Sequence, residues 1–215
     1  MTNSPSTALS DLAGKKTSGT TDKGLLRVQA ILDAARQLLA TEGYAGLTMR
    51  AVASEVGVSL STVQHYFNNK EVLIQAVLTY VMDSYQAVVA DLMNSLSQQS
   101  QFERFMVIMD MVLVETRRPE TYGILTEICA LANRLPFAGR LMETVFAREQ
   151  KEIFRLIYGI EPTLTAQECK QRAAVMVALI HGLATQMVGK HGSALSRQQL
   201  EDAARQSFIR LATQP

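Results

Sequence analysis

Residues 60–67 combine hydroxyl, amide and aromatic side chains with almost no formal charge. The spacing of Val63 and Phe67 predicts that both face inward on a helix. The side chains that then face outward or sideways are Leu60, Ser61, Thr62, Gln64, His65 and Tyr66. A helix face that meets only water more often carries Lys and Glu. This composition therefore favours a surface that enters a groove of nucleic acid.

Two side chains near this face have the hydrogen-bonding geometry for base edges. A glutamine amide pairs in bidentate fashion with adenine and an arginine with guanine, and each pair discriminates by about 1–3 kcal/mol. Gln64 and Arg50 are the candidates. Side chains suited to phosphate contacts, which fix the register of a protein on DNA, are Thr62, His65, Tyr66 and Lys70. Lys70 begins a helix, where a nearby phosphate would relieve its opposition to the helix dipole.

Two short helices around a glycine would position these side chains. Thr48 is expected to cap a helix that buries Val52, Ala53 and Val56, and Gly57 is expected to end it. Ser59 then caps a second helix over residues 60–67. A bracing helix, a tight turn and an exposed second helix form a helix-turn-helix. The sequence predicts this motif between Thr48 and Phe67.

At these residues the sequence resembles the TetR family of helix-turn-helix transcriptional regulators, of the TetR/AcrR type. The matching residues are Leu47, Thr48, Met49, Arg50, Ala51, Val52, Ala53, Gly57, Val58, Ser59, Thr62, Val63, His65, Tyr66, Phe67, Lys70, Glu71, Val72 and Leu73. The similarity covers about residues 25–75. It implies base contacts from Arg50, Leu60, Ser61 and Gln64. It also implies phosphate contacts from Thr48, Thr62, His65, Tyr66 and Lys70.

Two of these positions depart from the family pattern. Gln64 stands where the family very often has tyrosine, and Ser61 stands where glycine, alanine or proline is frequent. Neither residue blocks DNA binding, but the base preference of a relative cannot be transferred to this sequence. The resemblance further implies a repressor that a small-molecule effector releases from double-stranded operator DNA. It implies a homodimer paired through the last two helices, near residues 165–188 and 196–212.

The composition predicts an all-α protein, because hydrophobic residues make up 47% and Ala, Leu, Gln and Met recur where a β protein would have strand formers. We expect a flexible tail over residues 1–24, a three-helix DNA-binding domain over 25–75, and a larger ligand-binding and dimerisation bundle over 76–215. The expected first helix runs from Leu25 to Thr41, with Gly43 as its stop. A long helix should follow from Lys70 toward Met93, capped by Asn69 and with Val88 on its apolar stripe. On the last helix, Ala203 is expected to face inward.

The effector pocket is the least specified part of the prediction. Candidate lining residues are Phe105, Met106, Met109, Tyr122, Glu127 and His181. Methionine fills irregular space easily, so the methionines suit either an adaptable pocket or an ordinary core. His181, on a largely apolar helix, likewise suits a ligand contact or a satisfied core histidine.

Several other classes of protein lack support. The sequence has no GxGxxG, Walker-type or GxSxG motif, so we expect no enzymatic activity and no cofactor. No HExxH spacing occurs, so no metal site is expected. Cys129 and Cys169 are interpreted as buried reduced thiols, with a redox role left open. The longest apolar runs, such as Val175–Ile180, are far shorter than the roughly 20 residues of a membrane span.

These features predict a soluble cytoplasmic protein.

The formal net charge is only +1, so bulk electrostatics does not favour nucleic-acid binding. A helical ligand-binding or scaffolding protein that has lost operator recognition therefore remains the alternative to a regulator.

Overall fold

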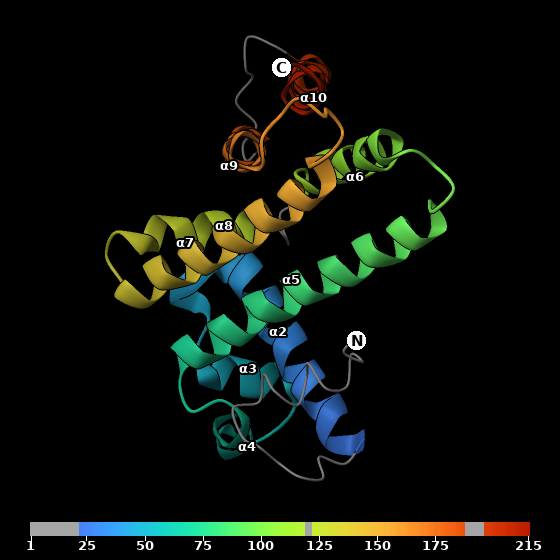
Figure 1. Cartoon of the computed structure of the whole chain (residues 1–215). Helices are drawn as coiled ribbons and strands as arrows, with labels where there is room; N and C mark the ends of the chain where they lie inside the picture. The colour runs from blue at the N-terminus through green and yellow to red at the C-terminus, as the bar shows by residue number, and fades with distance from the viewer. Residues whose placement is uncertain (1–21, 119–121, 188–195) are drawn as a thin grey trace. The chain divides into compact units, whose positions relative to one another are not determined.

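The computed structural model describes residues 22–118, 122–187 and 196–215, and all regular structure in these ranges is helical (Figure 1). The α-helices are α2 (Asp22–Gly46), α3 (Met49–Val56), α4 (Leu60–Tyr66), α5 (Lys70–Ser95), α6 (Gln101–Glu115), α7 (Ile124–Ala132), α8 (Pro136–Ile157), α9 (Ala166–Met187) and α10 (Arg197–Thr213). The predicted all-α fold is confirmed. Most of the expected tail, and the expected end of α9 at Val188, lie outside the described residues.

The chain forms two compact units, the first continuing past residue 75 to Ala87 and the second spanning Val88–Pro215. In the first unit, α2 buries one face, made of Val28, Ile31, Leu32, Ala34, Ala35 and Leu39. This helix starts at Asp22, earlier than expected. Its helical geometry breaks at Gly43, whose φ of 66° and ψ of −171° favour glycine. Leu47, which is fully buried, follows the break.

The predicted caps of the next helices are present. The Thr48 hydroxyl accepts a hydrogen bond from the amide of Ala51 at 3.1 Å, and Ser59 accepts one from the amide of Thr62 at 3.2 Å. Gly57 ends α3 in the left-handed conformation, with φ of 68°. Asn69 accepts a hydrogen bond from the amide of Val72 at 2.9 Å and so caps α5. The turn between α3 and α4 is therefore fixed by local side-chain chemistry.

The first turns of α5 supply the first unit with Leu73, Ile74, Ala76, Val77 and Leu78, all buried. Val88, expected on the same stripe, is 54% exposed, because it lies beyond the part of the helix that this core covers. Among the described helices, α5 is long and apolar enough to cross a membrane by length and composition alone, although single polar residues interrupt its apolar runs. The core helices of water-soluble proteins meet the same criterion.

In the second unit α8 packs against both α7 and α9, and α10 packs against α9 and α6 (Figure 1). The helices α6 to α10 each contribute buried apolar side chains, among them Phe105, Ile128, Met142, Met176 and Phe208. The Gln101 amide of α6 donates hydrogen bonds to the carbonyls of Leu156 and Tyr158, both at 2.9 Å, at the end of α8. Polar contacts thus join the start of α6 to the end of α8.

Charged side chains fasten α10 to its neighbours. Arg205 contacts the carboxylate of Asp110 in α6 through two hydrogen bonds of 2.7 and 3.1 Å. Arg117 makes a second bidentate pair with Glu201, whose side chain is only 6% exposed. Ala203, expected to face inward, is exposed instead. The helix turns Glu201 inward because Arg117 supplies the partner that a buried carboxylate needs.

Candidate nucleic-acid interface and effector site

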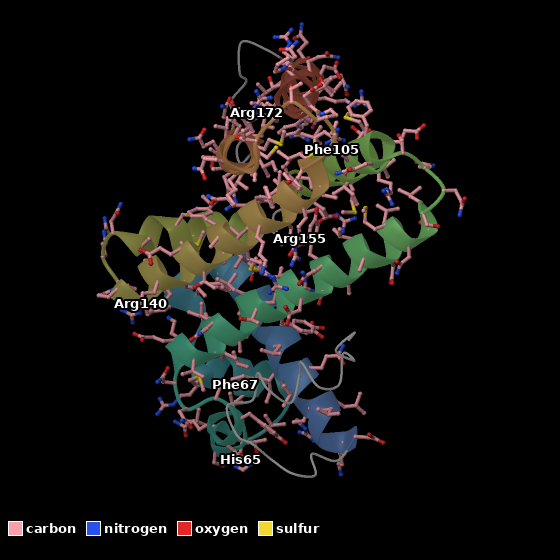
Figure 2. All side chains as sticks on the ribbon, viewed as in Figure 1. His65, Phe67, Phe105, Arg140, Arg155 and Arg172 are labelled. Carbon is pink, nitrogen blue, oxygen red and sulfur yellow. The ribbon has the colours of Figure 1, made fainter. Side chains whose placement is uncertain are left out.

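The outer face of α4 follows from the burial of two residues. Val63 and Phe67 are both 0% exposed, as predicted. Their burial leaves Ser61, Gln64 and His65 exposed, while Leu60, Thr62 and Tyr66 are half-buried at the edges of the face. Figure 2 shows His65 on the outer side of α4 and Phe67 on its inner side, toward α3. Arg50 and Thr48, at the start of α3, are also exposed.

Hydroxyl groups at the start of α4 form a local cluster. The Ser59 Oγ lies 2.8 Å from the Ser61 Oγ and 2.8 Å from the Thr62 Oγ1. A hydroxyl has one proton and two lone pairs, so these groups keep hydrogen-bonding capacity beyond the cluster. The rings of His65 and Tyr66 pack edge to face, with centroids 5.1 Å apart. Contacts within α4 and its cap therefore hold Ser61, Thr62, His65 and Tyr66 in place, and the DNA contacts of these side chains remain predictions.

Lys70 has an internal role that the sequence did not indicate. Its ammonium group donates a hydrogen bond to the carbonyl of Tyr44 and lies 3.7 Å from the centroid of the Tyr44 ring. Burial lowers the pKa of Lys70, because partial desolvation disfavours the charged form. Lys70 thus joins the start of α5 to the chain just after Gly43. Its predicted phosphate contact would have to be made alongside this contact.

Three of the predicted effector residues belong to the buried face of α6. Phe105, Met106 and Met109 are 0%, 8% and 1% exposed. Their burial favours the core interpretation that the sequence left open. Glu127, on α7, is half-buried.

Tyr122 and His181, by contrast, come together in the second unit. Their ring centroids are 5.7 Å apart, and Phe146 of α8 lies on His181 at 5.0 Å, both edge to face. The Nε2 of His181 lies 2.7 Å from the Glu149 Oε2. Neither Phe146 nor Glu149 was among the predicted effector residues. Their i, i+3 spacing places them on one face of α8, but nothing in the sequence indicated that α9 would bring His181 to that face.

Cys129, on α7, is half-buried and Cys169, on α9, is buried. Burial raises the pKa of both thiols, and for Cys129 the negative charge of Glu149 raises the pKa further. A raised pKa keeps a thiol protonated and weakly reactive. The interpretation as buried reduced thiols fits Cys169 better than Cys129.

The comparison with known proteins places the first unit in a class. Residues 31–77 match the profile of bacterial regulatory proteins of the tetR family. An uncharacterised HTH-type transcriptional regulator from Xanthobacter autotrophicus is 49% identical over 51 residues, 24% of this chain and 25% of that protein. The nicotine-responsive transcriptional repressor HdnoR of Paenarthrobacter nicotinovorans is 28% identical over 133 residues, 61% of this chain and 67% of that one.

The similarity in fold extends to the second unit. A putative TetR-family regulator from Rhodococcus has a solved structure with a TM-score of 0.71 and 23% identity, covering 86% of this chain and 98% of that one. The first unit therefore contains a helix-turn-helix whose α4 face is exposed, and this unit is the part of the chain that matches the family profile. Through residues 31–77, the chain is similar to bacterial regulatory proteins of the tetR family.

Proposed function

We propose that the protein is a cytoplasmic repressor that binds a palindromic operator as a homodimer and leaves it when a small effector binds the second unit. The observation that carries this proposal is the exposed face of α4, on which Ser61, Gln64 and His65 project over two buried anchors, Val63 and Phe67. A helix so anchored can place side chains in the major groove without distorting its own core.

The proposed dimer rests on the outer face of α9. Among the small residues of this helix, Ala173 and Ala184 are buried within the unit. Ala178 and Gly182 are exposed, and a Cβ added to Gly182 would meet no neighbouring atom. Val175, at 48% exposure, continues the same face at helical spacing. This strip therefore suits close approach of a second copy, and such a symmetric dimer would carry two recognition helices for the two halves of a palindrome.

The proposed effector response rests on linkage. The protein is expected to have one conformation that fits DNA and another that does not. An effector lowers the affinity for the operator only if its own affinity is higher for the second conformation than for the first. The second unit offers a partly open polar cluster around His181 where such a ligand can bind. A relative named as a nicotine-responsive repressor supports a small organic effector.

Fluorescence anisotropy with DNA from upstream of the protein's own gene, at a stated salt concentration, tests the operator prediction. We expect selective binding over scrambled DNA of the same length, because base contacts add about 4–10 kcal/mol to non-specific binding. Equal affinity for both DNAs at low salt would contradict the proposal and favour the helical ligand-binding alternative.

The dimer proposal is tested by Ala178→Arg, which places a long charged side chain on the exposed face of α9. We expect native mass spectrometry to find a dimer in the wild type and a monomer in this variant. Ala147→Arg, at an exposed position of α8, is the matched control and should remain dimeric. A wild-type monomer, or an A178R dimer of unchanged stability, would contradict the proposed interface.

A further inference from the structure

His181 lies among groups that stabilise positive charge. The rings of Tyr122 and Phe146 pack on it at 5.7 and 5.0 Å, and the Glu149 carboxylate bonds to its Nε2 at 2.7 Å. The faces of aromatic rings attract cations, and a carboxylate adds a full opposite charge. These groups come from the turn before α7, from α8 and from α9, so the tertiary fold assembles them.

The cluster is sheltered and still open to solvent. The side chains of His181 and Glu149 are 17% and 26% exposed, and Tyr122 is 7% exposed. Partial burial strengthens a charge interaction relative to open water, while the remaining exposure leaves a route for a ligand.

We propose that the effector is an organic cation, a protonated amine or a quaternary ammonium, that binds the Glu149 carboxylate between the rings of Tyr122 and Phe146. The inference rests on the proposed effector-binding role of the second unit. The cation takes over the Glu149 carboxylate oxygen to which the Nε2 of His181 bonds. Because Glu149 belongs to α8 and His181 to α9, this exchange breaks a contact between the two helices.

The surroundings of Glu149 favour an organic cation over a metal ion. On the α7 side, the negative charge of Glu149 reaches Cys129, whose burial and raised pKa keep it an uncharged thiol. In the ranges that the structure describes, no three His, Cys, Asp or Glu side chains gather as a metal site. One carboxylate and two aromatic rings match a soft, bulky cation better than a metal ion that requires several ligands.

Isothermal titration calorimetry on the full-length protein without DNA tests the proposal. The probes are choline, benzyltrimethylammonium and benzylamine, with 3,3-dimethylbutan-1-ol as the uncharged isostere of choline. We expect at least one cation to bind and the uncharged isostere to bind at least about tenfold more weakly than choline wherever choline binds. Binding by none of the three cations, or equal affinity of choline and its isostere, would overturn the proposal.

Glu149→Gln keeps the shape of the side chain and removes its charge. We expect it to weaken cation binding by about tenfold or more, whereas Glu143→Gln, at an exposed position of the same helix, should leave the affinity unchanged. Phe146→Leu keeps apolar volume without a ring and should weaken cation binding about three- to tenfold. Wild-type affinity in the Glu149→Gln variant, with a circular dichroism melt that confirms folding, would overturn the proposal.

Operator release is measured separately, by adding the bound cation to the protein–DNA complex. Cation binding without release would contradict the proposed repressor mechanism and leave the cation site standing. Selective operator binding without any cation binding would contradict the cation site and leave the regulator standing.

Discussion

The two units of the molecule carry their candidate sites in different ways. In the first, residues 48–67 form a site within one continuous segment, and the caps Thr48, Gly57 and Ser59 act on amides or carbonyls within a few residues. In the second, Tyr122, Phe146, Glu149 and His181 meet from distant parts of the sequence. A site within one continuous segment can be predicted from the sequence. A site formed by residues that are distant in the sequence depends on how the helices pack.

The polar contacts named above show the same contrast between neighbouring and distant residues. The bonds that shape the helix-turn-helix join residues within one turn of helix. In the second unit, Arg205–Asp110 and His181–Glu149 join different helices, and Arg117–Glu201 joins the turn after α6 to α10. Changes in the first unit should therefore affect DNA directly, and changes in the second should act through helix packing.

The largest effect on stability is expected at Phe67, which anchors the helix-turn-helix in the core of the first unit. Phe67→Ala should lower the free energy of unfolding by about 3–5 kcal/mol, because it empties a fully buried ring position, and it should abolish operator binding. His65→Ala, two residues away and exposed, should change stability by less than about 0.5 kcal/mol. Urea unfolding followed by circular dichroism measures both. A small loss in Phe67→Ala would mean that α4 does not depend on this anchor.

In the second unit, Arg117→Ala should destabilise the protein by about 1–3 kcal/mol, because it leaves the buried Glu201 carboxylate without its partner. The adjacent control is Arg118→Ala, whose exposed pair with Glu115 at 3.4 Å should be worth less than about 1 kcal/mol. Adding Glu201→Leu to Arg117→Ala should recover much of the loss. Equal melting temperatures for the two arginine variants would argue against a structural role for the Arg117–Glu201 pair.

Gln64→Ala tests specificity within the local site. We expect a loss of about 1–3 kcal/mol in discrimination at one base pair of each half-site, with little change in non-specific affinity. Anisotropy titrations against operators substituted one base pair at a time provide the measurement. Equal weakening on every sequence would mean that Gln64 does not contact a base.

Lys70 combines a predicted DNA contact with a longer-range structural contact, to Tyr44. Lys70→Ala should weaken binding to all DNA about equally and cost about 1 kcal/mol of stability through loss of its contact with Tyr44. Tyr44→Leu should reproduce the loss of stability without the change in salt dependence of DNA binding. If both variants bind DNA with wild-type salt dependence, Lys70 is structural only.

Much of the first unit was predictable because capping chemistry is short-range. Thr48, Gly57, Ser59 and Asn69 were assigned from residue type and position alone, and the structure has each in the predicted role. Burial of Val63 and Phe67 followed from helical periodicity. The errors arose where periodicity does not decide burial: Val88 lies beyond the core that covers the start of α5, and Ala203 is exposed while Glu201 is buried.

The sequence by itself determined the all-α class, the helix-turn-helix and the face that it presents, because these depend on hydrogen bonds and side-chain spacings within a few residues. Only the tertiary structure decided which polar residues of the second unit meet. The helices α7, α8 and α9 pack through their hydrophobic faces, and the hydrophobic effect has no directional preference. The sequence therefore does not specify that Glu149 will face His181. That contact became visible only when the packed helices fixed its geometry.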